Sequence, residues 1–184
     1  MIYPISLQQA GILAGVLVLL AHAAAWFQPD LCKRWLKGFP RSRAAGTVLI
    51  VVAAVWSLVL ISNMDLGEFA RLRNVMIGGI VAGAFLSWRY VEEFLAVRAL
   101  GMILLLAAEP LLEAAFLRPE ASRLLLVVLA YGWIIAGLFW VGLPWLMRDQ
   151  VAWVTAKPRR FQTAALAGVV YGAAILVCAL AFWK

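Results

Sequence analysis

FLAVRALGMILLLAAEPLLEAAFL, residues 94–117, is apolar and long enough to cross a membrane, yet it carries Arg98, Glu109, Pro110 and Glu113. An α-helix needs about 20 mainly apolar residues to span the ~30 Å hydrocarbon layer. Acidic side chains lie deep inside a spanning pattern nowhere else in this chain. The stretch therefore predicts a membrane protein and marks the place where polar groups need an explanation.

The composition of the whole chain agrees with this interpretation. Of its 184 residues, 66% are hydrophobic, whereas water-soluble domains are usually about 45–50% apolar. The apolar runs are continuous and not alternating, which favours helices over a barrel. We expect an all-α, polytopic membrane helical bundle, formed by residues 1–184 as one domain, with six transmembrane helices at residues 5–26, 44–64, 75–91, 94–117, 124–147 and 162–183.

The region from Val75 to Leu117 must contain a turn. As a single helix its 43 residues would be ~64 Å long, about twice the hydrocarbon thickness. The polar run at residues 89–93 is the natural place for the chain to reverse. Arg98 then lies next to this turn, where its long side chain is expected to reach the inner surface.

The distribution of positive charge predicts which side of the membrane each loop faces. Lys and Arg are enriched in cytoplasmic loops. We therefore expect both termini on the outer, periplasmic or extracellular side of a bacterial inner (plasma) membrane. With six spans, most of the 16 Lys and Arg residues fall in the first, third and fifth loops, at positions Lys33, Arg34, Lys37, Arg41, Arg43, Arg89, Arg98, Arg148, Lys157, Arg159 and Arg160.

This arrangement also explains the net charge of +7, since basic residues next to spans indicate membrane topology and not nucleic-acid binding. We expect anionic lipid headgroups to contact a basic cytoplasmic surface made of Lys33, Arg34, Lys37, Arg41, Arg43, Arg159 and Arg160. A W-x4-P-R pattern precedes the second span at Trp35 and the sixth at Trp153. The pattern fits either an internal repeat or the general preference of these residues for interfaces.

Three G-x-x-x-G motifs, at Gly11 and Gly15, Gly79 and Gly83, and Gly168 and Gly172, lie in the first, third and sixth spans. Paired glycines let membrane helices approach closely because no side chain separates their backbones. Their number favours a compact bundle.

Glu109 and Glu113 are four residues apart and share one helix face. Glu109 would lie ~12 Å from the outer end of its span, where an ionised carboxylate costs about 2.5–3.5 kcal/mol. One interpretation is an outward-facing polar pocket lined by Glu109, Glu113, Tyr131 and Arg71 or Arg73. The other is a structural salt bridge between helices.

No motif of a known enzyme class is present, and the single histidine, His22, together with two separated cysteines, indicates no metal site and no cofactor. We therefore favour a non-catalytic protein. Three functions remain open, of which an intramembrane enzyme that uses Glu109 or Glu113 is the least favoured. The first is a subunit or accessory factor of a membrane complex, in contact with the bilayer and other membrane subunits. The second is a small-solute or lipid-binding or transport protein with a pocket around Glu109.

Overall fold

The computed structural model describes residues 3, 5–91 and 93–183. Within these residues it contains helices and no strands, and six of the helices are long and apolar enough to cross a membrane. The predicted all-α class and the number of spanning helices are confirmed. In chain order the elements are α1 (Leu7–Phe27), α2 (Pro29–Gly38), η1 (Phe39–Arg41), α3 (Arg43–Asn63), η2 (Gly67–Leu72), α4 (Arg73–Tyr90), α5 (Leu95–Ala115), η3 (Ala121–Arg123), α6 (Leu124–Gly142), α7 (Trp145–Thr155) and α8 (Pro158–Ala181).

Five of the predicted spans agree with α1, α3, α4, α5 and α8 to within a few residues, but the predicted end of the fifth span is wrong. Helix α6 stops at Gly142, and a new helix, α7, begins at Trp145. Pro144 lies between them, and proline cannot donate the backbone hydrogen bond that a continuing helix requires. The residues 145–147 therefore belong to a separate helix.

Local sequence signals explain several helix ends. Ser6 precedes α1, and its hydroxyl accepts a hydrogen bond from the Gln9 backbone at 3.2 Å while the Gln9 side chain accepts one from the Ser6 backbone at 3.1 Å. This reciprocal capping box satisfies two donors at the helix start. Between α4 and α5, Phe94 adopts a left-handed backbone with φ of 58°, which reverses the chain near the predicted turn.

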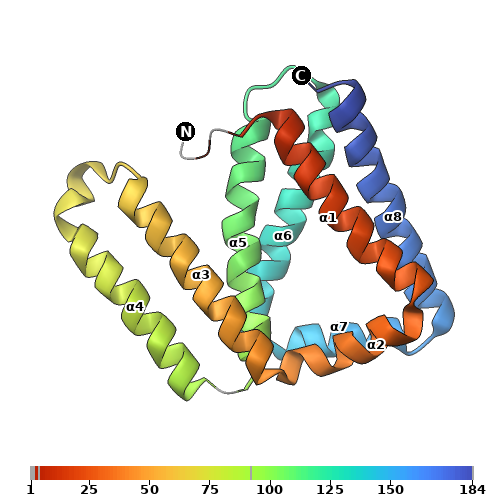
Figure 1. The fold of residues 1–184 in the computed structure, drawn as a ribbon, viewed down its shortest axis with the longest axis horizontal. Helices are drawn as coiled ribbons and strands as arrows, with labels where there is room; N and C mark the ends of the chain where they lie inside the picture. Colours follow the sequence, from red (N-terminus) through yellow and green to blue (C-terminus); the bar gives the residue numbers. More distant parts are fainter. Residues whose placement is uncertain (1–2, 4, 92, 184) are drawn as a thin grey trace.

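Four spanning helices form the main body of the molecule. Helix α1 packs along α8 and α5 packs along α6, and the two pairs meet at the end of the bundle where α1 begins and α8 finishes (Figure 1). Small residues such as Ala10, Ala114 and Ala130 fill the shared core, together with Leu7, Leu126 and Trp183. This core holds the four helices together without the help of α4.

Helices α3 and α4 form a hairpin that leans away from the body (Figure 1). Helix α3 approaches α5 closely near its start, where a methyl group added at Gly46 would lie 3.0 Å from the Ala96 backbone nitrogen. Helix α4 contains no buried residue. The hairpin is thus anchored through α3 at one end and separates from the body toward its tip.

Two short helices, α2 and α7, lie in contact at the opposite end of the body from the start of α1 (Figure 1). The sequence prediction treated α2 as a loop, and it divided α7 between the fifth span and the loop that follows residue 147. Helix α2 is amphipathic, with Leu31 and Trp35 exposed among its basic residues, as in helices that lie along a membrane surface. Each W-x4-P-R motif joins one of these helices to the next span.

Candidate functional site

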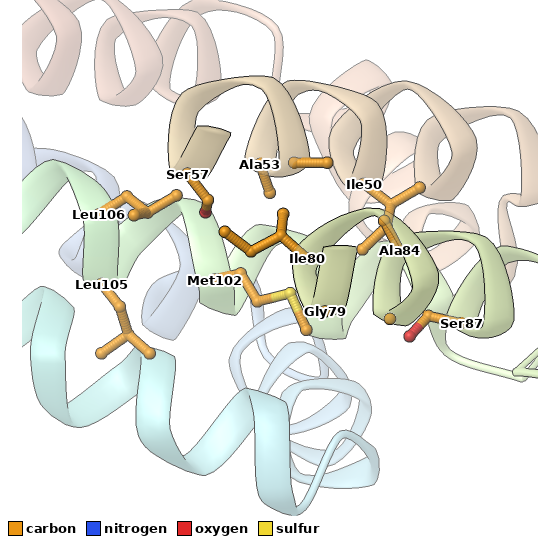
Figure 2. Close-up of a pocket in the computed structure, with 12 residues that line it drawn as sticks. Ile50, Ala53, Ser57, Gly79, Ile80, Ala84, Ser87, Met102, Leu105 and Leu106 are labelled. Atoms are coloured by element: carbon orange, nitrogen blue, oxygen red, sulfur yellow. The ribbon is translucent and has the colours of Figure 1, made fainter. Parts of the chain in front are cut away.

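A cavity of about 420 Å³ lies between α3, α4 and α5. Figure 2 shows side chains from all three helices pointing into it. Such a volume falls in the range of small-molecule sites in proteins. The lining is apolar apart from two serines and consists of Ile50, Ala53, Ala54 and Ser57 from α3, Gly79, Ile80, Gly83, Ala84 and Ser87 from α4, and Met102, Leu105 and Leu106 from α5.

Small residues form most of the α4 side of the cavity. A methyl group added at Gly79 or Gly83 would have no neighbouring atom within 4 Å. These glycines therefore do not support a close helix contact, although the sequence predicted one. On the opposite side, the bulky side chains of Met102, Leu105 and Leu106 contribute the α5 wall.

Two hydroxyl groups, those of Ser57 and Ser87, line this apolar space (Figure 2). Within the described residues neither hydroxyl makes a hydrogen bond, whereas Thr47 and Thr163 donate to carbonyls one helical turn earlier, at 3.0 and 2.8 Å. An unbonded hydroxyl in an apolar environment costs free energy. The serines therefore offer hydrogen bonds to whatever fills the cavity.

The predicted acidic pair lies next to this cavity. Glu109 and Glu113 line a second hollow of about 680 Å³, whose other walls are mostly apolar and come from α5 and from Ile134 of α6. Leu105 lines both spaces. The two hollows therefore adjoin at Leu105, with an apolar part nearer the middle of α5 and an acidic part nearer the end of that helix.

The segment before α1 reaches this acidic end through Tyr3. Its hydroxyl accepts a 2.6 Å hydrogen bond from the Trp56 indole of α3, and its backbone nitrogen lies 3.4 Å from a carboxylate oxygen of Glu113. Burial raises the pKa of Tyr3, the Trp56 hydrogen bond lowers it, and the negative charges of Glu109 and Glu113 raise it further. Tyr3 thus connects the hairpin to the body within electrostatic range of both carboxylates.

The structure does not bring the other predicted pocket residues to this place. Tyr131 lies on α6 with 55% of its surface exposed and does not line the acidic hollow. Arg71 is exposed in η2, and Arg73 donates to the carbonyls of Ser62 and Met64 at 3.0 and 2.8 Å. Both arginines lie at the tip of the hairpin, which leans away from α5 (Figure 1). These residues were predicted to lie at a depth in the membrane similar to that of the acidic pair, but they do not lie close to it.

Arg98 forms a contact between two spanning helices that the sequence did not predict. Its guanidinium donates a 3.2 Å hydrogen bond to the Val141 carbonyl near the end of α6, and its Nε atom is buried without a partner in the described part of the chain. The side chain is therefore half-buried and is held against α6 by this bond. It connects α5 to the last turn of α6, where carbonyl groups lack helical partners.

The predicted basic surface gathers at the end of the molecule formed by α2, α7 and the starts of α3 and α8. Two of its cations rest on aromatic rings, Lys33 on Phe161 at 5.2 Å and Arg160 on Trp153 at 4.5 Å. The other five basic side chains of this surface are all exposed: Arg34, Lys37, Arg41, Arg43 and Arg159.

Sequence reasoning identified Glu109 and Glu113 but missed Tyr3, Trp56 and the two cavity serines. Ser57 interrupts the apolar run of the second span, and this interruption could have indicated a polar contact there. Nothing in the sequence indicates that Tyr3 contacts a residue 53 positions later.

The fold and these hollows define a class, a multi-pass α-helical membrane protein with a cavity between its spanning helices. No protein-family model, curated protein or solved structure matches the chain. In the described residues, no three His, Cys, Asp or Glu side chains gather closely enough to hold a metal ion.

Proposed function

We propose that this protein is a non-catalytic membrane protein that binds a lipid chain in the cavity between α3, α4 and α5. The observation that supports this most directly is the unfilled space beside Gly79 and Gly83, in a chain whose other two G-x-x-x-G motifs are packed tightly. The sequence favoured a subunit first and a lipid-binding protein second. The cavity is our reason for now placing the lipid-binding function first.

A lipid fits this space better than a polar solute does. The walls are aliphatic, and α4 has no buried residue, so the hairpin lies open to the bilayer. A chain from the surrounding membrane can enter sideways without crossing a polar barrier. Its ester groups are of the right kind to accept hydrogen bonds from Ser57 or Ser87.

The most direct experiment fills the cavity from α4. In Gly83→Leu, the new side chain enters open space and occupies the site without meeting another backbone. The protein is purified in a mild detergent, its bound lipid is extracted, and the amount per protein is measured by mass spectrometry. We expect wild type to retain lipid and Gly83→Leu to lose most of it.

Gly78→Leu is the matched control, because Gly78 lies on the same helix, has equal space around it and does not line the cavity. It should retain lipid as wild type does. Equal lipid content in all three proteins would refute the proposal.

A second candidate function is the subunit or accessory factor of a membrane complex. It is favoured by the complete absence of buried residues in α4, since a partner helix could cover this span and use its glycines for close packing. In that case Gly83→Leu would release a stoichiometric partner protein during purification, and the lipid content would not change.

The proposed setting is a bacterial inner (plasma) membrane, with both termini on the periplasmic side. Its support is the collection of basic residues at the end formed by α2 and α7, as expected for a cytoplasmic face. Anionic headgroups are the proposed partners of this basic surface. We expect a reporter enzyme that works only in the cytoplasm to be inactive when it is fused after Lys184.

A further inference from the structure

The hollow beside Glu109 adjoins the apolar cavity and differs from it in charge. We propose that this hollow binds the ammonium headgroup of a lipid such as phosphatidylethanolamine, whose chain lies along α5 in the adjoining cavity. This inference rests on the proposed function, because it specifies the headgroup of the same ligand.

Residues that line the two hollows lie on one face of α5. Met102, Leu105 and Glu109 follow one another at intervals of three and four residues, so they lie on one face of the helix. Met102 and Leu105 line the apolar cavity, and Leu105 and Glu109 line the acidic hollow. Met102 and Glu109 are about 10 Å apart along the helix axis. An amphiphile lying on this face would place its chain beside Met102 and its headgroup beside Glu109.

Because Glu109 lies within its span, we expect its carboxylate to have a positively charged partner. The residue lies six positions before the end of α5, about 9 Å along the axis. A carboxylate within the span is costly unless it is paired or protonated. No hydrogen bond or salt bridge reaches the Glu109 side chain from the residues that the structure describes, and the side chain is exposed at the molecular surface.

The arginines of the chain do not provide this partner. Arg73 is engaged with carbonyls at the hairpin tip, and Arg123 donates to the Ala115 carbonyl at 3.0 Å. Arg118 lines a different hollow, which it shares with Tyr3 and Glu113. The acidic hollow itself contains no basic residue in the described part of the chain. Charge complementarity therefore favours a headgroup that places an ammonium group beside Glu109.

A headgroup with N–H donors suits Glu109 better than a quaternary ammonium does. A primary ammonium carries three donors and can make a charge-assisted hydrogen bond to a carboxylate. Such bonds are roughly twice as strong as bonds between neutral groups. A trimethylated headgroup has no donor and would offer only its charge.

The experiment titrates delipidated, detergent-purified protein with single lipids that carry identical acyl chains and measures binding by native mass spectrometry. The probes are phosphatidylethanolamine, its N-acetyl derivative and diacylglycerol. We expect phosphatidylethanolamine to bind wild type about tenfold more tightly than the other two lipids, as one charge-assisted hydrogen bond predicts.

Glu109→Gln should remove this preference and leave the affinity for diacylglycerol unchanged. The same variant separates an ammonium partner from simple protonation, because glutamine resembles a protonated carboxyl in shape and neutrality. Glu68→Gln, an equal loss of charge at an exposed position in η2, should behave as wild type.

Each of the other possible results contradicts one part of the proposal. If wild type binds all three lipids equally, the headgroup inference fails while the lipid cavity stands. If wild type binds none of them, the proposed function fails as well. If Glu109→Gln keeps the full preference, Glu109 is not the headgroup partner. The comparison of phosphatidylethanolamine with its N-acetyl derivative needs only the wild-type protein. It therefore tests the headgroup inference even when the variant does not fold.

Discussion

The same sequence motif has opposite structural outcomes in two regions of this molecule. Between α1 and α8, Gly15 and Gly172 face one another, and a methyl group added at Gly172 would lie 2.6 Å from the Leu19 backbone nitrogen. Between α4 and α5, a methyl group added at Gly83 would meet nothing within 4 Å. One pair of glycines thus joins two helices, and the other borders a cavity.

The difference comes from the opposing helix. In the contact between α1 and α8, a glycine of one helix lies against a glycine of the other, because a methyl group added at Gly15 would lie 3.2 Å from the Gly172 carbonyl oxygen, and the two backbones therefore approach closely. Helix α4 instead faces the larger side chains of Met102, Leu105 and Leu106. A G-x-x-x-G motif permits close approach, and a matching surface is needed to produce it.

The largest effect expected from this comparison is on stability, in the variant Gly172→Ala. The added methyl group would press on the Leu19 backbone and on the Gly15 carbonyl oxygen, at 3.1 Å. Backbone cannot move aside as a flexible side chain can, and overpacking typically costs about 1–3 kcal/mol. Thermal unfolding in detergent should show a clearly lowered midpoint.

The control for this variant is Gly78→Ala, because Gly78 has free space around it in another spanning helix. If Gly172→Ala unfolds at the same temperature as this control, the close contact between α1 and α8 does not exist as described.

A smaller effect is expected from Tyr3→Phe, which removes one hydrogen bond between the hairpin and the segment before α1. The Trp56 indole would lose the hydroxyl that accepts its 2.6 Å hydrogen bond. A typical hydrogen bond contributes about 0.5–1.5 kcal/mol. The unfolding midpoint should fall modestly, whereas Tyr90→Phe, on an exposed side chain, should leave it unchanged.

The Tyr3 contact should also depend on pH in the alkaline range. Burial and the nearby carboxylates raise the pKa of Tyr3 above its ordinary value of 10.0 in the folded protein. The unfolded chain therefore loses this proton first, and the contribution of Tyr3 to stability declines as the pH rises beyond 10.0. The difference in midpoint between wild type and Tyr3→Phe should shrink there. A difference that grows would contradict the raised pKa.

The spanning helices could be predicted from the sequence because each one depends mainly on its own composition. A run of about 20 apolar residues must be helical in a bilayer, whatever surrounds it. The capping pattern at Ser6 and Gln9 is local in the same sense. Helix α2 and the part of α7 after residue 147 were predicted as loops, because short amphipathic segments between spans look like polar loops when only hydrophobicity is counted.

The candidate site could be predicted only in part, because it depends on which helices become neighbours. The spacing of Glu109 and Glu113 on one face follows from helix geometry alone. Their surroundings do not, since Arg73 bonds within its own hairpin and Tyr3 arrives from the start of the chain. Equal depth restricts a residue to one layer of the membrane but leaves its position within that layer undetermined.

The smallest predicted effect completes the comparison of the two glycine motifs. Gly83→Ala adds a methyl group to open space, so no contact opposes it, and alanine in a helix is favoured over glycine by roughly 0.5–1 kcal/mol. The unfolding midpoint of the purified protein should therefore stay constant or rise slightly, in contrast to Gly172→Ala. A marked fall would mean that another helix, from a partner or a second copy, packs against Gly83. That result would favour the subunit function over the lipid-binding one, because a fluid lipid chain can adjust to one extra methyl group and a packed helix cannot.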